Sequence, residues 1–159
     1  MNVGSRPHRP ARLAVMILLL VILLSGLAHS IDNPDAPDLK SGFVERSRKF
    51  QDQIDNEAVN HRRRQFSADY AAFLNIELKA VYSQLNKQLG RESNSALKAS
   101  QRQWLAFRDA EREFITRTWI RDNFGSSFEL SREDYNNAIM RQRIEMLYDY
   151  LRNFSPVPR

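Results

Sequence analysis

Residues 101–114 read QRQWLAFRDAEREF, and they are the clearest helical segment of the chain. Its large apolar side chains, Trp104, Phe107 and Phe114, share one helical face, and the segment contains neither proline nor glycine. At about 100° per residue, however, Arg108 lies only about 40° around the helix from Trp104, and Glu111 lies about 20° to the other side. The segment is therefore predicted to be a helix that places charged side chains within its own apolar face.

The last helical segment repeats this feature, because Arg143 falls within its apolar stripe. An unpaired buried charge is strongly unfavourable, so such groups form pairs or reach water. We expect Glu111 to face Arg108 or Arg143, since a guanidinium can bind a carboxylate through two hydrogen bonds. Together with Gln101 on the same face, these residues are predicted to form a polar clamp that fixes helix register, or to line a groove for a partner.

The rest of the chain favours an all-α fold of three or four amphipathic helices, arranged as a small bundle or a long hairpin. Residues 39–89 contain no proline and form one kinked helix or two, with any break near residues 60–67, and Gly90 ends the pattern. The apolar residues that recur at helical spacing in the second part are Phe66, Tyr70, Phe73 or Leu74, Leu78, Val81, Leu85 and Leu89. A second helix is expected over residues 94–120, a loop over 121–130, and a last helix from Ser131 onward. The expected inward side chains of that last helix are Tyr135, Ile139, Met146, Leu147, Tyr150, Leu151 and Phe154.

The first thirty residues have the three-part pattern of a secretory signal peptide. Three arginines precede an unbroken apolar run over residues 13–24, and small residues follow, with cleavage expected near Ala28 or Ser30. The alternative is an uncleaved anchor, although the run is shorter than the roughly 18–20 residues that span a bilayer. Residues 31–38 are predicted to be a flexible leader, residues 39–65 a helical extension, residues 66–154 the main domain, and residues 155–159 a tail.

The composition of the exported part excludes several classes of protein. The chain has 24 basic and 19 acidic side chains, and three basic ones lie in residues 1–30, so residues 31–159 carry 21 against 19, a net charge of +2. Such a balance does not favour nucleic-acid binding. The chain has no cysteine, and residues 31–159 contain one histidine, His61, so we expect no lipid anchor, disulfide, metal site or cofactor. Only one carboxylate lies on the two stripes, so no catalytic residues are predicted.

Two further segments each allow two interpretations. The basic run His61–Arg64 is either a solvated helix face or a contact for an anionic surface such as a membrane or an acidic polymer. The loop WIRDNFGSSF carries Trp119, Phe124, Ser126 and Phe128, whose aromatic rings either cap the core or anchor a partner.

The segment LKASQRQWLAFRDAE, residues 97–111, resembles the pattern L-x-x-x-Q-R-x-W-x-x-x-R-D-A-E of the LprI-like lysozyme-inhibitor family. These are small exported bacterial proteins, named for a mycobacterial lipoprotein that inhibits lysozyme. Upstream, Leu78, Tyr82 and Leu85 resemble the family's L-N-x-x-Y-x-x-L helix. Downstream, residues 125–127 resemble its Gly-Gly-Ser loop, and residues 140–147 its T-x-x-R-x-x-x-L helix. The core residues that this resemblance implies are Trp104, Tyr82, Leu97 and Leu147.

The resemblance implies a helical envelope protein, periplasmic or secreted, that binds lysozyme or another envelope protein and is not an enzyme. Family members typically carry cysteines, which this chain lacks, so helix packing must replace any disulfide. Lysozyme is a basic protein, and Glu129, Glu133 and Asp134 form an acidic group that would suit it. The alternative is a structural or stress-related envelope protein that binds an anionic surface through the basic run. The oligomeric state stays open.

Overall fold

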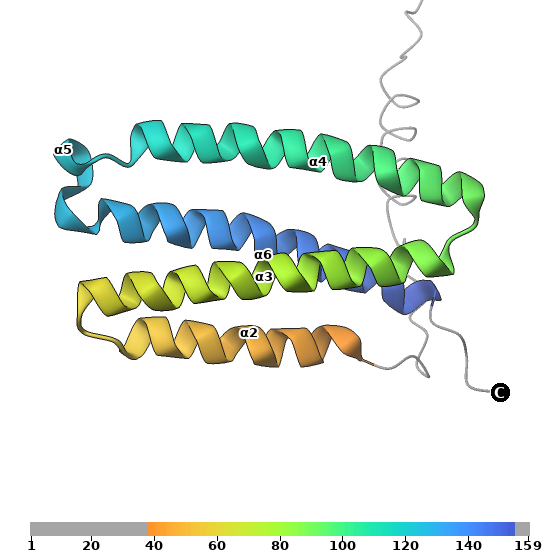
Figure 1. The fold of residues 1–159 in the computed structure, drawn as a ribbon, viewed down its shortest axis with the longest axis horizontal. Coiled ribbons are helices and arrows are strands. Elements are labelled where there is room, and N and C mark those ends of the chain that lie inside the picture. Colours follow the sequence, from red (N-terminus) through yellow and green to blue (C-terminus); the bar gives the residue numbers. More distant parts are fainter. Residues whose placement is uncertain (1–37, 155–159) are drawn as a thin grey trace, which may run out of the picture. The chain divides into compact units, whose positions relative to one another are not determined.

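The computed structural model describes residues 38–154, and these residues are helical almost throughout (Figure 1). Four long helices, α2 (Leu39–Asn56), α3 (Asn60–Gln88), α4 (Arg91–Thr118) and α6 (Phe128–Phe154), follow one another. A single turn, α5 (Arg121–Phe124), and a 3-10 turn, η1 (Gly125–Ser127), connect the last two. The predicted all-α class is confirmed. The predicted signal peptide, residues 31–37 of the leader and the tail lie outside the described residues.

The first half of the chain forms two helices, which settles the alternative that the sequence left open. The break covers residues 57–59, just before the predicted region. Asp38 caps the start of α2 by accepting a hydrogen bond from the Ser41 backbone N–H at 3.0 Å. At the other end, Arg63 on α3 donates to the Ile54 carbonyl at 3.2 Å, and so binds one of the carbonyls that a helix end leaves free.

The core lies between α2, α3 and α6. α3 contributes the inward face predicted from its periodicity, and Leu74 and Val81 on it are fully buried. α2 packs against this core through Phe43, whose ring is also fully buried and stacks on Tyr148 of α6 at 5.6 Å. Each large apolar side chain buried in this way stabilises the fold by about 1.5–3 kcal/mol. α2 is therefore an integral part of the helical unit.

α6 is rotated relative to the prediction. Its buried stripe consists of Leu130, Met140, Ile144, Leu147, Tyr148 and Leu151. Leu147 and Leu151 were expected there, but the expectation was wrong for Tyr135, Met146, Tyr150 and Phe154, which are 43–48% exposed. Two neighbouring stripes of α6 are apolar, and sequence periodicity does not show which one the other helices cover.

α4 packs against α6 (Figure 1), and its boundaries differ slightly from the prediction. It begins at Arg91 rather than at Asn94, and ends at Thr118. Leu97 and Ile115 are its buried side chains. Phe107 and Phe114 were expected inside, but they are 53% and 55% exposed, because α6 covers only a narrow line along α4.

The predicted loop over residues 121–130 is largely helical. Gly125 has a φ of 61°, a conformation that favours glycine, and it reverses the chain between α5 and η1. α6 then begins at Phe128, three residues before the predicted start. Ser131 is therefore not the cap of α6, and its hydroxyl donates to the Ser127 carbonyl at 3.4 Å within the helix.

Candidate functional site

Arg143, one of the four residues of the predicted polar clamp, extends its side chain from α6 to α4. Its guanidinium donates from Nε and Nη2 to Gln101 Oε1 at 3.2 and 3.0 Å, and from Nη2 to Ser100 Oγ at 3.3 Å. It also lies over the Trp104 ring, 5.8 Å from the centroid. Arg143 is only 6% exposed, and burial lowers its pKa from the usual value. The structure therefore brings Gln101, Trp104 and Arg143 together.

Glu111 does not take the place expected for it. Arg108 lies over Trp104 at 5.5 Å, but its guanidinium binds Asp109 Oδ1 at 2.6 Å. Arg143 uses Gln101 and Ser100, so within residues 38–154 neither arginine pairs with Glu111. Neutral oxygen acceptors stabilise the buried Arg143 guanidinium, and the cation–π contact of its flat face with the Trp104 ring adds to that stabilisation.

The remaining motif residues surround this clamp. Leu97 and Leu147 are buried in the core cluster, at 8% and 0% exposure. Tyr82 and Trp104 are partly buried and pack against the same cluster. The arrangement fixes α4 on α6, whereas a role of the clamp in partner binding stays a prediction.

The predicted partner segment forms an aromatic corner where α4, α5 and α6 meet. The Trp119 ring lies 5.9 Å from Phe114, 5.6 Å from Phe124 and 4.7 Å from Tyr135. We call these four residues the aromatic corner. Trp119 is half-buried, whereas the other three are 42–55% exposed. The rings therefore support one another and still offer apolar surface to solvent.

Arg132 of α6 binds the end of α4 next to the aromatic corner. It donates to the Trp119 carbonyl at 2.6 Å and to the Thr116 carbonyl, both at the end of α4. Its guanidinium also lies over the Phe128 ring, 4.9 Å from the centroid. Ser126 is exposed and lines a shallow depression with Phe128. Phe128 thus faces Arg132, while the structure places Trp119 and Phe124 together.

The basic run is engaged within the protein. Arg62 lies 3.4 Å from a Glu57 carboxylate oxygen, Arg63 holds the Ile54 carbonyl, and Arg64 forms a salt bridge with Glu129 of α6. These contacts join the α2–α3 break to α6, so three arginines of the run have partners among the described residues. A contact between this run and an anionic surface stays a prediction.

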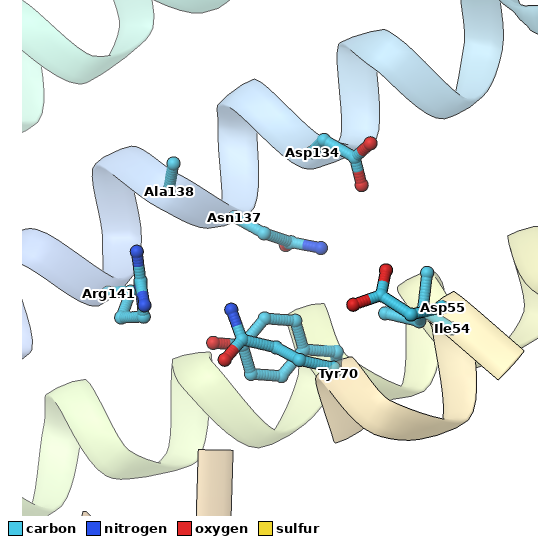
Figure 2. Close-up of a pocket in the computed structure, with 8 residues that line it drawn as sticks. Ile54, Asp55, Tyr70, Asp134, Asn137, Ala138 and Arg141 are labelled. Carbon is cyan, nitrogen blue, oxygen red and sulfur yellow. The ribbon is translucent and has the colours of Figure 1, made fainter. Parts of the chain in front are cut away.

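A cavity that the sequence did not reveal lies between α2, α3 and α6 (Figure 2). Its volume is about 210 Å³, and it is lined by Gln51, Ile54, Asp55, Tyr70, Asp134, Asn137, Ala138 and Arg141. Asp55 and Asp134 belong to helices distant in sequence, and only Asp134 belonged to the predicted acidic group. The sequence carried no signal for the cavity, because α2 must first pack against α6 to form it.

The walls of this cavity differ in chemistry. Tyr70 and Asn137 are 3% and 6% exposed, and the Asn137 amide nitrogen donates to the Ser67 carbonyl at 3.3 Å and to Ser67 Oγ at 3.2 Å. Loss of hydration raises the pKa of the Asp134 carboxyl above its usual value, against the opposing effect of Arg63, and the charge of Asp55 adds to the increase. The cavity therefore combines buried side chains, Tyr70 and Asn137, with a carboxyl group whose pKa is raised.

The predicted acidic group is divided by the fold. Glu129 forms a salt bridge with Arg64. Burial raises the pKa of the Glu133 carboxyl, and a hydrogen bond with Ser67 opposes this increase. Asp134 is exposed and faces the cavity. Among residues 38–154, no cluster of three or more histidine, cysteine or acidic residues is placed to hold a metal ion. In the same range no helix has the length and apolarity needed to cross a membrane.

Comparison with known proteins identifies a family. The model of the family described as "Lysozyme inhibitor LprI" matches residues 52–147, more than half of the chain. The matched range begins near the end of α2 and includes the clamp and the aromatic corner. Comparison with curated proteins and with solved structures gives no match. The chain belongs to the LprI lysozyme-inhibitor family, as the motif around Trp104 predicted.

Proposed function

We propose that the protein is an exported, non-enzymatic inhibitor that binds a lysozyme of the bacterial envelope or its surroundings. The family match over residues 52–147 carries this proposal. An inhibitor of this kind needs no reactive group of its own. It needs only a surface that fits the enzyme and closes its substrate cleft to the polymer.

The aromatic corner is the contact surface that the geometry favours. Large aromatic rings at protein interfaces commonly supply most of the binding energy. Phe124 and Tyr135 are exposed, and their contacts with Trp119 fix their positions before any partner arrives. Rings held in place in this way lose little conformational freedom on binding.

Calorimetric titration of the protein into a panel of lysozymes tests this proposal. We expect submicromolar binding to at least one of them, and we expect Phe124→Ser to weaken it at least about tenfold. Phe107→Ser is the matched control, because Phe107 is 53% exposed, compared with 42% for Phe124, and lies along α4, away from the corner. The absence of binding across the panel would refute the proposed function. Equal effects of the two substitutions would refute the choice of surface.

A further inference from the structure

The cavity shown in Figure 2 has an excess of unbound acceptors. Within residues 38–154, neither the Asp55 nor the Asp134 carboxylate forms a salt bridge or accepts a hydrogen bond. The nearby cations have other partners, since Arg63 binds the Ile54 carbonyl and Arg141 lies 3.8 Å from Glu145. Arg141 also lines the cavity, and the charge of Arg63 lowers the pKa of Asp134 against the effect of burial. The cavity therefore offers two carboxylates, one from α2 and one from α6, that form no salt bridge within the described residues.

The floor of the cavity suits a flat or compact cation. The Asn137 side chain projects from α6 between Asp134 and Tyr70. Because its nitrogen donates to Ser67, its amide oxygen remains as an acceptor, and it accepts no hydrogen bond within the described residues. The buried Tyr70 ring adds a π surface, and its hydroxyl group is held by Ser47 at 2.5 Å. These groups are fixed before a ligand enters.

The volume is sufficient for a side-chain head group. At about 210 Å³, the cavity exceeds by more than tenfold the roughly 10–15 Å³ that one water molecule requires. We propose that this cavity receives the guanidinium or ammonium group of a basic side chain from a protein partner. Asp55 and Asp134 bind its charge, Asn137 accepts one of its hydrogen bonds, and Tyr70 packs against it.

The position of the cavity connects it to the aromatic corner. Asp134 and Tyr135 are consecutive on α6, so one faces the cavity while the other belongs to the corner. The α2–α3 break and α5 also lie at the same end of the helices (Figure 1). A basic protein seated across the start of α6 would contact both. The identity of that protein as a lysozyme rests on the proposed function, whereas the chemistry of the cavity does not.

The cavity is tested first with a small probe, by NMR titration of the protein expressed from its full-length sequence. The probe is N-acetyl-L-arginine amide, and the matched control is N-acetyl-L-citrulline amide, which has nearly the same shape without the charge. We expect the arginine probe to shift the Asn137 side-chain amide signal with a dissociation constant on the order of millimolar. The citrulline probe should leave that signal unchanged. No shift, or equal shifts from both probes, would overturn the proposal without reference to any variant.

The partner is tested with Asp55→Asn/Asp134→Asn, which removes two charges but keeps the side-chain shapes. Glu45→Gln/Asp52→Asn is the matched control, since it removes the same charge from exposed positions of α2 outside the cavity. We expect the cavity variant to lose the arginine shift and to bind lysozyme at least about tenfold more weakly than the control variant does. Equal lysozyme binding by both variants would overturn the inference and leave the proposed function intact. Failure of the unmodified protein to bind any lysozyme would refute the proposed function, and the probe titration would still decide the cavity.

Discussion

The buried guanidinium of Arg143 allows a sharp prediction about the family motif. Gln101 supplies the acceptor for both Nε and Nη2, and Ser100 adds one further oxygen. Gln101→Leu keeps the side chain's approximate volume but leaves a charged group, only 6% exposed, with Ser100 Oγ and the weak acceptor Met146 Sδ as its partners. Arg143→Met removes the charge itself and keeps an unbranched apolar side chain over Trp104.

The magnitudes follow from these contacts. Leaving a buried donor without its partner costs about 1–3 kcal/mol, so we expect Gln101→Leu to destabilise the fold by about 2 kcal/mol. Arg143→Met loses the cation–π contact with Trp104, but it also removes the unfavourable burial of the charge, so its net cost should stay near 1 kcal/mol or below. In the double variant no charge remains to be satisfied. Its cost should therefore match that of Arg143→Met alone, which corresponds to a coupling of about 2 kcal/mol, the full cost of Gln101→Leu.

Urea unfolding followed by far-UV circular dichroism measures the three free energies of unfolding. For a domain of this size, a loss of about 2 kcal/mol lowers the Tm by roughly 6–12 °C, so thermal unfolding gives an independent check. Additive effects of the two substitutions would refute the reasoning, because they would mean that Arg143 does not depend on Gln101. Arg143→Met costing more than Gln101→Leu would refute it as well.

Three further predictions follow from the packing and the electrostatics. Phe43→Ala should destabilise the fold by about 3–5 kcal/mol in urea unfolding, since the ring is fully buried. Val44→Ala, at the neighbouring residue that is 44% exposed, should cost less than about 0.5 kcal/mol. Equal costs would mean that α2 does not pack as described. Arg132→Ala should lower the free energy of unfolding by about 1–3 kcal/mol and speed amide hydrogen exchange at the end of α4, because it frees the carbonyls of Thr116 and Trp119. Arg117→Ala, which removes a largely exposed ion pair, should change neither stability nor exchange. Unchanged stability and exchange in Arg132→Ala would contradict the prediction. Burial, with the hydrogen bond to Glu77, raises the pKa of Tyr148 to about 12 from an ordinary value of 10.0. Its contribution to stability should therefore be complete below pH 10 and lost as the pH rises through about 12, and Tyr148→Phe should remove the late phase of an absorbance titration; a titration unchanged by Tyr148→Phe would refute this.

Much of the fold was readable from local pattern. The face of α3 was predicted because its apolar spacing is regular and one stripe dominates. Arg143 was recognised as a buried charge from its place within the apolar residues of α6. The partner of Arg143 was not predicted correctly, because the choice among Gln101, Ser100 and Glu111 depends on the offset between α4 and α6 along their axes. Sequence spacing fixes angles within one helix and says nothing about the offset between two.

The same limit explains the errors at the surface. Phe107 and Phe114 have the residue type of core positions, yet α4 packs mainly against α6 and leaves them exposed. The cavity formed by Asp55 and Asp134 joins residues from opposite ends of the domain, so no window of sequence contains it. Helix existence and inner faces follow from periodicity, whereas sites that require two helices to meet follow only from their packing.

Inhibition is measured in a lysis assay, in which lysozyme clears a suspension of bacterial cells while the purified protein is added in increasing amounts. We expect clearing to slow as the protein approaches the molar amount of lysozyme, and we expect Phe124→Ser to restore clearing while Phe107→Ser does not. Clearing at an unchanged rate in a large excess of folded protein, for every lysozyme in the panel, would contradict the assignment of inhibitory function.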